Sequence, residues 1–150
     1  MCYFSIFETG LPYIQSSASR SFTFGTIDLT NPKACEWTER LIRCNILGDQ
    51  KGCDHNATAI SAPIKGWMSD FGEYLPWDAV MFSGESAGVV HNQFPNLWST
   101  VCRNAVQASG LEKEVTFFSR SANAYSPSSA TLFWAGDQLT SWDQYDGMQR

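Results

Sequence analysis

The sequence predicts an α/β fold whose strands run parallel. Short apolar segments that read as strands alternate with two amphipathic helices, and polar segments containing glycine and proline separate them. The predicted order is strand, helix, strand, helix, strand, turn and strand, which is typical of parallel strands covered by helices. Two architectures fit this order, a doubly wound sheet and part of a (β/α)8 barrel. Both place functional residues at the C-terminal ends of the strands.

The first predicted elements lie between residues 26 and 47. Residues 1–25 mix aromatic residues with a serine-rich stretch and predict a poorly defined, loop-like segment, and residues 26–29 predict a short strand. Asn31 and Pro32 then form a typical helix start, with a capping side chain before a proline in the first turn. Apolar residues at helical spacing predict an amphipathic helix over residues 32–47: Ala34, Trp37, Leu41 and Cys44.

The second half of the chain repeats the alternation. Residues 48–63 predict a polar loop, and residues 64–69 a strand. A helix is predicted over residues 89–108, with its regular part beginning near Pro95 and a C-terminal stop at Gly110. Further strands are predicted at 115–119 and 131–135, separated by a loop or short helical turn at 121–130.

Composition excludes several classes of protein. The chain has 150 residues, 43% of them hydrophobic and 17% charged, which is enough for one globular domain with a core. Its net charge is −5 and its basic residues are scattered, so we expect no nucleic-acid partner. No apolar run reaches the roughly 20 residues that span a membrane. Residues 1–7 carry no signal-peptide pattern, so we expect a cytoplasmic protein.

The five cysteines do not suggest a disulfide framework or a metal site. They are widely spaced and odd in number, and reduced thiols are the simplest interpretation. Cys44, Cys53 and His55 lack the ligand spacing and the fourth partner of a zinc site. We therefore predict neither a metal nor another cofactor.

Two aspartates carry the functional interpretation. Asp70 and Asp137 each follow a predicted apolar strand, with glycine and aromatic residues beside them. Two carboxylates that face one cleft are the groups that most glycoside hydrolases use to cleave a glycosidic bond. An aspartate at a strand end is, taken alone, more often a helix cap or a turn former. The residue types therefore suggest glycoside hydrolysis without deciding it.

Four segments resemble a known enzyme family. Residues 66–76 (GWMSDFGEYLP) resemble the nucleophile segment of glycoside hydrolase family 31, and residues 134–138 (WAGDQ) resemble its acid/base segment. The intervening segments 91–98 and 117–120 also match, so the resemblance covers roughly residues 10–150. The sequences of the two aspartate segments are most similar to those of the α-glucosidase and sulfoquinovosidase branch of the family.

The resemblance implies a fold and a mechanism. Residues 26–150 would form a partial (β/α)8 TIM barrel of about four of the eight strands, with residues 48–65 as an inserted loop. Asp70 would be the nucleophile and Asp137 the general acid/base of a retaining α-glycosidase. Arg120 matches an arginine that lines the subsite for the cleaved sugar. The implied substrate is a carbohydrate, either an α-glucoside or a sulfoquinovoside.

Three other residues are candidate substrate contacts. Glu73 would orient the surroundings of Asp70 or bind a sugar hydroxyl, and a solvated loop glutamate is the alternative. Trp67 and Trp134 would wall the pocket, although tryptophans in strands often belong to the core. The chain departs from the family pattern after Arg120, where Ser121 and Ala122 stand in place of Ala-Gly.

Two function classes remain after this reasoning. The first is a retaining glycosidase that cleaves O-glycosyl bonds by double displacement. The second is a catalytically inert, truncated fragment of such an enzyme, because the chain supplies only part of a barrel, and activity of the isolated chain is doubtful. A stand-alone sugar-binding module is weaker, since paired carboxylates suit hydrolysis better than binding.

Overall fold

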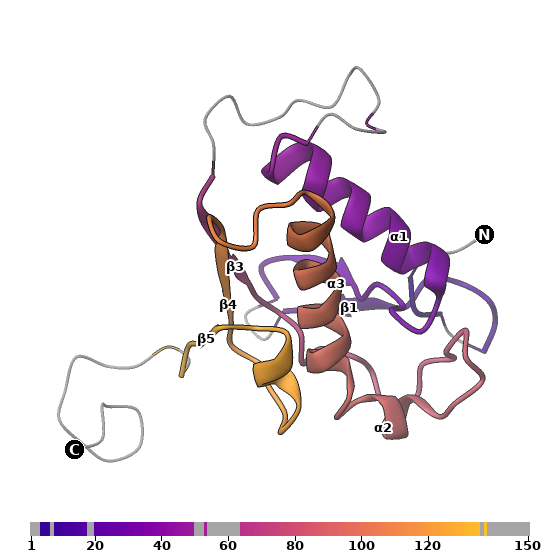
Figure 1. Cartoon of the computed structure of the whole chain (residues 1–150). Helices are drawn as coiled ribbons and strands as arrows, with labels where there is room; N and C mark the ends of the chain where they lie inside the picture. The colour runs from indigo at the N-terminus through magenta and orange to yellow at the C-terminus, as the bar shows by residue number, and fades with distance from the viewer. Residues whose placement is uncertain are drawn as a thin grey trace, which may run out of the picture.

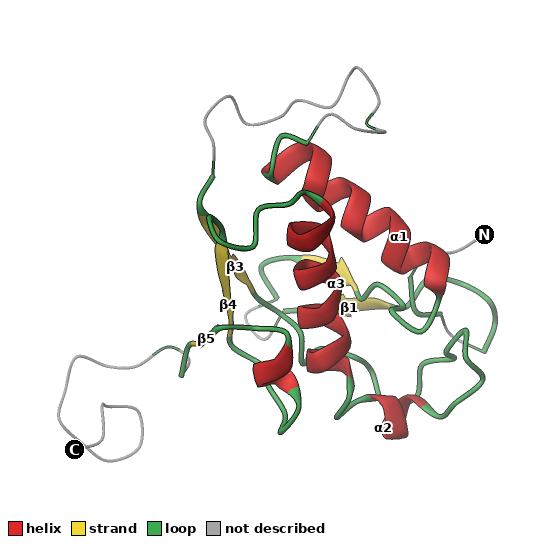
Figure 2. Ribbon diagram, viewed as in Figure 1, coloured by secondary structure: helices red, strands yellow, loops and turns green. Residues whose placement is uncertain are grey.

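A computed structural model describes residues 4–6, 8–17, 20–49, 53, 64–135 and 137. Figures 1 and 2 show the arrangement of its helices and strands. In chain order the elements are β1 (Ile14–Ser16), β2 (Thr23–Gly25), α1 (Pro32–Leu41), the π-helical turn η1 (Ile42–Ile46), β3 (Gly66–Ser69), α2 (Ala87–Val90), α3 (Phe94–Ala108), β4 (Thr116–Ser119), the 3-10 turn η2 (Ser126–Ser128) and β5 (Leu132–Phe133).

The centre of the fold is an open parallel sheet of the order β3-β4-β5. Its strands are paired so that Ser69 lies opposite Ser119, and Ser119 lies opposite Phe133. Helix α3 packs against this sheet, and α1 packs against α3 (Figure 1). The described residues therefore form a mixed α/β unit with parallel strands, as predicted, and no closed barrel.

Helix α1 begins where the sequence predicts. The side chain of Asn31, in an extended backbone conformation, accepts a hydrogen bond from the Lys33 N–H, and Pro32 occupies the first turn. The helix continues into η1, which ends at Ile46. Together they cover the predicted range 32–47 to within one residue.

The second predicted helix is divided into two. A short α2 ends at Val90, and α3 begins at Phe94 with Pro95 in its first turn. Proline is tolerated there because the first turn of a helix does not need the backbone N–H that proline lacks. Beyond the end of α3, Gly110 adopts a φ of +70°, the left-handed conformation that stops a helix and suits glycine. The predicted stop at Gly110 is confirmed.

Small polar side chains fill the interface between α3 and the sheet. The Ser69 hydroxyl lies 2.8 Å from the Cys102 sulfur, and the Ser99 and Ser119 hydroxyls lie 3.4 Å apart. All four residues are buried. Burial raises the pKa of the Cys102 thiol to about 11, since an apolar surrounding disfavours the thiolate. The hydroxyls of Ser69, Ser99 and Ser119 have polar partners within the core, so helix and sheet can pack closely without leaving these three groups unsatisfied.

The structure corrects the prediction for the N-terminal part of the chain. Residues 1–25 are not all loop, because β1 and β2 pair as antiparallel strands. The predicted strand at residues 26–29 does not join the parallel sheet. Ile27 forms only an isolated antiparallel bridge with Phe4, and Asp28 is buried and accepts hydrogen bonds from the N–H groups of Thr30 and Phe82. Three parallel strands, not four, lie in the described sheet.

The cysteine prediction is also corrected. Cys44 and Cys53 form a disulfide, whereas Cys35 and Cys102 are free thiols. The bond links η1 to the predicted inserted loop. Of that loop, residues 50–52 and 54–63 lie outside the described residues, as do Cys2 and His55.

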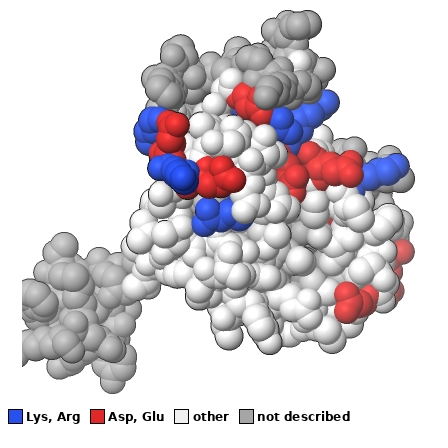
Figure 3. Space-filling view, viewed as in Figure 1, with Lys and Arg blue, Asp and Glu red and all other residues white. Residues whose placement is uncertain are grey.

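None of the helices in the described ranges is long and apolar enough to cross a membrane. Lys and Arg on the face drawn in Figure 3 lie beside acidic residues and do not form a continuous stripe. Among the residues that the structure describes, no group of three or more His, Cys, Asp or Glu is arranged to hold a metal ion.

Candidate active site

Three loops meet at one edge of the parallel sheet. They follow the C-terminal ends of β3, β4 and β5 and begin with Asp70, Arg120 and Trp134. Because the three strands are parallel and adjacent, these ends lie at the same edge (Figure 2). Polar residues at this edge of an α/β sheet are typical of active sites.

Asp70 is held by its neighbours in a fixed orientation. Its carboxylate accepts a hydrogen bond of 2.9 Å from the Phe71 N–H, and its carbonyl oxygen accepts one of 3.1 Å from the Trp98 indole of α3. Phe71 has a φ of +62°, which is uncommon for a residue with a side chain. The side chain of Asp70 is 23% exposed, so the carboxylate is partly shielded but still reachable.

Arg120 joins Asp70 to a second carboxylate. Its Nη2 lies 3.2 Å from Asp70 Oδ1 and 2.5 Å from Glu73 Oε1, and its Nε donates a further hydrogen bond of 3.0 Å to Glu73 Oε1. Partial burial works to lower the pKa of Arg120. The hydrogen bond to Glu73 and the charges of Glu73 and Asp70 outweigh it, so the pKa is raised. The guanidinium therefore stays positive beside two carboxylates.

Aromatic rings surround the guanidinium. Its central carbon lies 5.4 Å from the ring centre of Phe71, 6.0 Å from that of Tyr74 and 5.9 Å from that of Trp134. These separations are within the range of cation–π attraction. Of these three residues, Trp134 was predicted from the sequence, and Phe71 and Tyr74 were not. Both lie inside the segment 66–76, so their position in the chain beside Asp70 and Glu73 could have identified them as site residues.

Trp67 lies elsewhere. Its ring stacks on the buried Phe117 with centres 5.4 Å apart, and its indole N–H donates to the Ser69 hydroxyl. Trp67 is therefore on the side of the sheet that packs against α3, away from the Asp70–Arg120 pair. Its contact with substrate stays a prediction without support from the described contacts.

Asp137 follows β5 by four residues and is exposed. Among the described residues, no hydrogen bond or ion pair joins it to Asp70 or Arg120. Its neighbours 136 and 138–150 lie outside the described residues. The structure thus brings together Asp70, Glu73, Arg120 and Trp134 of the six predicted site residues, and leaves the role of Asp137 a prediction.

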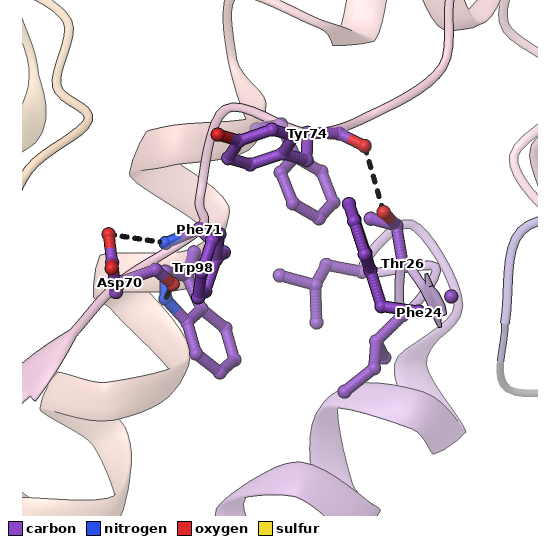
Figure 4. Close-up of a pocket in the computed structure, with 10 residues that line it drawn as sticks. Phe24, Thr26, Asp70, Phe71, Tyr74 and Trp98 are labelled. Atoms are coloured by element: carbon purple, nitrogen blue, oxygen red, sulfur yellow. Dashed lines mark hydrogen bonds between the residues drawn. The ribbon is translucent and has the colours of Figure 1, made fainter. Parts of the chain in front are cut away.

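A cavity of about 120 Å³ lies behind Asp70. Figure 4 shows Phe71 and Trp98 on one side of it and Phe24 on the other, with Tyr74 above. The Thr26 hydroxyl donates a 2.8 Å hydrogen bond to the Tyr74 carbonyl and ties the two walls together. The Asp70 carboxylate lies at the edge and points away from the cavity (Figure 4). The cavity is lined mainly by apolar side chains, and the Asp70 carboxylate does not face into it.

A glycine allows the loops after β3 and β4 to approach each other. A side-chain carbon at Gly72 would collide with the Ser121 hydroxyl and the Trp98 ring. Glycine at this position keeps the segment carrying Asp70 and Glu73 close to the segment carrying Arg120. Ser121 stands where the family pattern has alanine. Its hydroxyl fits beside Gly72 because glycine has no side chain.

The sequence profile of the glycosyl hydrolases family 31 TIM-barrel domain matches residues 7–149. The chain belongs to this family. The predicted family resemblance is thereby confirmed.

Two curated relatives are sulfoquinovosidases. The protein of Escherichia coli (strain K12) is 38% identical over 127 residues, and that of Agrobacterium fabrum (strain C58) is 34% identical over 128 residues. Each alignment covers 85% of this chain but 17% of the relative. A solved GH31 sulfoquinovosidase of E. rectale, in complex with the aza-sugar inhibitor IFGSQ, superposes with a TM-score of 0.77 at 39% identity, covering 91% of this chain and 18% of that one.

Proposed function

We propose that this chain carries the catalytic carboxylates of a retaining α-glycosidase, with Asp70 as the nucleophile and Asp137 as the general acid/base. The observation that carries the proposal is the Asp70–Arg120 pair at the C-terminal edge of a parallel sheet. An oriented, partly shielded carboxylate beside a fixed cation is what a nucleophile of this class requires. In the same proposal the open sheet is part of the wall of a (β/α)8 barrel that a longer protein completes.

The proposed reaction has two steps that invert the anomeric carbon in turn. In the first, a carboxylate oxygen of Asp70 bonds to the anomeric carbon while the bond to the leaving oxygen breaks. The Asp137 carboxyl gives its proton to that oxygen. In the second, Asp137 takes a proton from water, the water oxygen bonds to the anomeric carbon, and the ester bond to Asp70 breaks.

The contacts of Asp70 suit the first step. The Phe71 N–H and the Arg120 guanidinium both attach to Oδ1, which leaves Oδ2 without a hydrogen bond from the described residues. Attack by Oδ2 would therefore disrupt no existing contact of Oδ1. Donors that remain in place as the carboxylate becomes an ester are an example of a preorganised site.

We propose two substrate classes. The named relatives are sulfoquinovosidases, which supports a sulfoquinovoside as the first candidate. An α-glucoside, which only the motif resemblance implies, is the second. Trp134, Tyr74 and Phe71 support a sugar substrate of either class, because aromatic faces beside a carboxylate can stack on a sugar ring.

Covalent trapping tests the proposed roles. The full-length protein, comprising this chain and the remainder of the barrel, is incubated with a fluorinated glycosyl fluoride whose second step is slow. We expect the peptide carrying Asp70 to gain the mass of one glycosyl group, and Asp70→Asn to remain unlabelled. A label on another carboxylate would reject Asp70 as nucleophile, and formation of a product with inverted configuration would reject the two-step mechanism.

An inert fragment is the second candidate, and a specific observation favours it. The chain spans 17% of the curated relatives it matches, and its described sheet is open. A barrel typically takes about 250 residues. Turnover measured on the 150-residue chain alone tests this second candidate, because hydrolysis of an aryl α-glycoside by the chain would reject the inert fragment.

A further inference from the structure

We infer that Glu73 is a positioning residue that occupies the hydrogen-bonding fork of Arg120, so that Arg120 does not serve as a receptor for an anionic group of the substrate. The inference rests on the proposed function only in taking the ligand of this site to be a glycoside. It deepens that function by stating which part of the substrate Arg120 does not recognise.

The hydrogen bonds of Arg120 account for the donors that an anion would use. A guanidinium has five N–H groups, and it binds carboxylates, sulfonates and phosphates best through two parallel donors. Here Nε and Nη2 both donate to Glu73 Oε1, and Nη2 also reaches Asp70 Oδ1. The edge formed by Nε and Nη2 is therefore taken. Only Nη1 has no acceptor among the described residues.

Glu73 is in turn held by Arg120. Every hydrogen bond that its carboxylate accepts from the described residues comes from the guanidinium, and its second oxygen, Oε2, is buried without a partner there. The side chains of Arg120 and Asp70 are each 23% exposed and that of Glu73 is 37% exposed, so solvent screens the pair only in part. Glu73 and Arg120 thus form one unit beside Asp70.

The charge of the cluster and the orientation of the aromatic rings also disfavour binding of an anion at Arg120. Two carboxylates face one guanidinium, so the cluster carries a net negative charge that repels an anion. The rings of Phe71, Tyr74 and Trp134 present their faces toward the cation, and an aromatic face is its negative side. A sulfonate entering here would lose hydration without gaining two parallel donors from neighbouring nitrogens.

A consequence for specificity follows. If the full-length protein cleaves an anionic glycoside, residues other than Arg120 must bind the anion. Arg120 instead holds its charge beside Asp70, where a neutral part of the sugar would meet it. Glu73 keeps Arg120 beside Asp70 and away from an anionic group, because it fixes the orientation of the guanidinium.

An anion titration tests the inference without requiring turnover. The 150-residue chain is labelled with nitrogen-15 in arginine, the Nε–H signal of Arg120 is assigned from Arg120→Lys, and methanesulfonate is added. We expect no saturable shift of this signal in the wild type. Glu73→Gln and Glu73→Ala should both bind methanesulfonate saturably. We expect their affinity to exceed that of the wild type by about tenfold or more, because each substitution exposes the donors that a charge-assisted pair uses. Formate should compete with methanesulfonate in Glu73→Ala.

Control variants separate this effect from a loss of fold. Glu114→Gln removes an exposed carboxylate that pairs with Lys65, and it should leave the Arg120 signal unchanged. The amide spectrum reports whether each variant is folded, and calorimetry with the full-length protein repeats the titration in the complete barrel. Saturable binding of methanesulfonate by wild-type Arg120, or no gain in folded Glu73→Gln and Glu73→Ala, would overturn the inference. Neither result bears on the trapping of Asp70, so the proposed function stands or falls separately.

Discussion

The side of the parallel sheet that packs against α3 and the C-terminal edge of the sheet differ in charge and in exposure. On the side that packs against α3, Trp67, Ser69, Phe117 and Ser119 are uncharged, and the last three are buried. At the C-terminal edge, the very next residues, Asp70 and Arg120, are charged and partly exposed. Side chains alternate between the two faces of a strand, so neighbouring residues of one chain segment belong to different environments.

This contrast separates stability from chemistry. The α3 side has apolar packing and paired hydroxyls, and its contacts would be lost on unfolding. The C-terminal edge holds an unusual backbone conformation at Phe71 and two carboxylates on one arginine, which are features that a fold does not need for its stability. Substitutions on the α3 side should therefore lower stability, whereas substitutions at the C-terminal edge should lower activity.

The largest expected effect concerns Asp70. In the full-length protein, Asp70→Ala should lower kcat by about 10⁴-fold or more, because the variant lacks the carboxylate on which the proposed covalent intermediate forms. The free energy of unfolding should change by less than about 1 kcal/mol, since its ion pair is partly exposed. Glu112→Gln, at an exposed position away from the site, is the matched control. Activity within tenfold of wild type in Asp70→Ala would contradict the assignment.

Asp137 should show an effect that depends on the leaving group. Asp137→Ala should slow hydrolysis of alkyl glycosides by about 10²–10⁴-fold, the range typical of general acid catalysis. Aryl glycosides with acidic leaving groups should lose much less, because they depart without a proton. Steady-state rates on both substrate types check this, and equal losses would argue against a role as the acid.

The α3 side should respond in stability. Phe117 is 2% exposed and stacks on Trp67, so Phe117→Ala should lower the free energy of unfolding of the chain by about 3–5 kcal/mol. Phe118→Ala is the matched control, since the neighbouring half-buried ring points to the other face and should cost about 1–2 kcal/mol. Denaturant unfolding monitors both. Similar losses for the two variants would contradict the sidedness of the sheet.

A smaller effect is expected at the start of α1. Asn31→Ala should lower the free energy of unfolding by about 1 kcal/mol, because the helix loses the acceptor for the Lys33 N–H. Asn31→Ser should retain most of that contribution. Thermal unfolding measures both variants, and no difference between alanine and serine would show that the side chain is not acting as a cap.

Much of the fold could be predicted because local signals agree with the tertiary structure. Asn31 and Pro32 start a helix through contacts within one turn, and Gly110 stops one through its own backbone conformation. The strands at 66–69 and 116–119 contain aromatic and apolar residues that favour a strand, so composition identifies them. The segment 66–76 also identified Asp70 and Glu73, which the structure places together.

Other features depend on partners distant in sequence. β1 and β2 are three residues each and gain their definition from pairing with each other, so no periodicity marks them. The Cys44–Cys53 disulfide joins two residues whose spacing alone does not indicate a bond. Trp67 reads equally well as a pocket wall or a core residue, because the alternation of a strand does not say which face meets α3. The rings of Phe71 and Tyr74 reach Arg120 only through the loop conformation after Asp70.

The separation of the Asp70 and Asp137 carboxyl groups in an experimental structure of the full-length protein tests the central claim most directly. A retaining mechanism requires about 5–5.5 Å between them, with Arg120 in contact with Asp70. We predict this separation across a single cleft at the C-terminal edge of the sheet. A separation of about 6.5–9.5 Å would contradict retention and indicate an inverting enzyme, and carboxyl groups on opposite faces of the sheet would contradict the two-aspartate site itself.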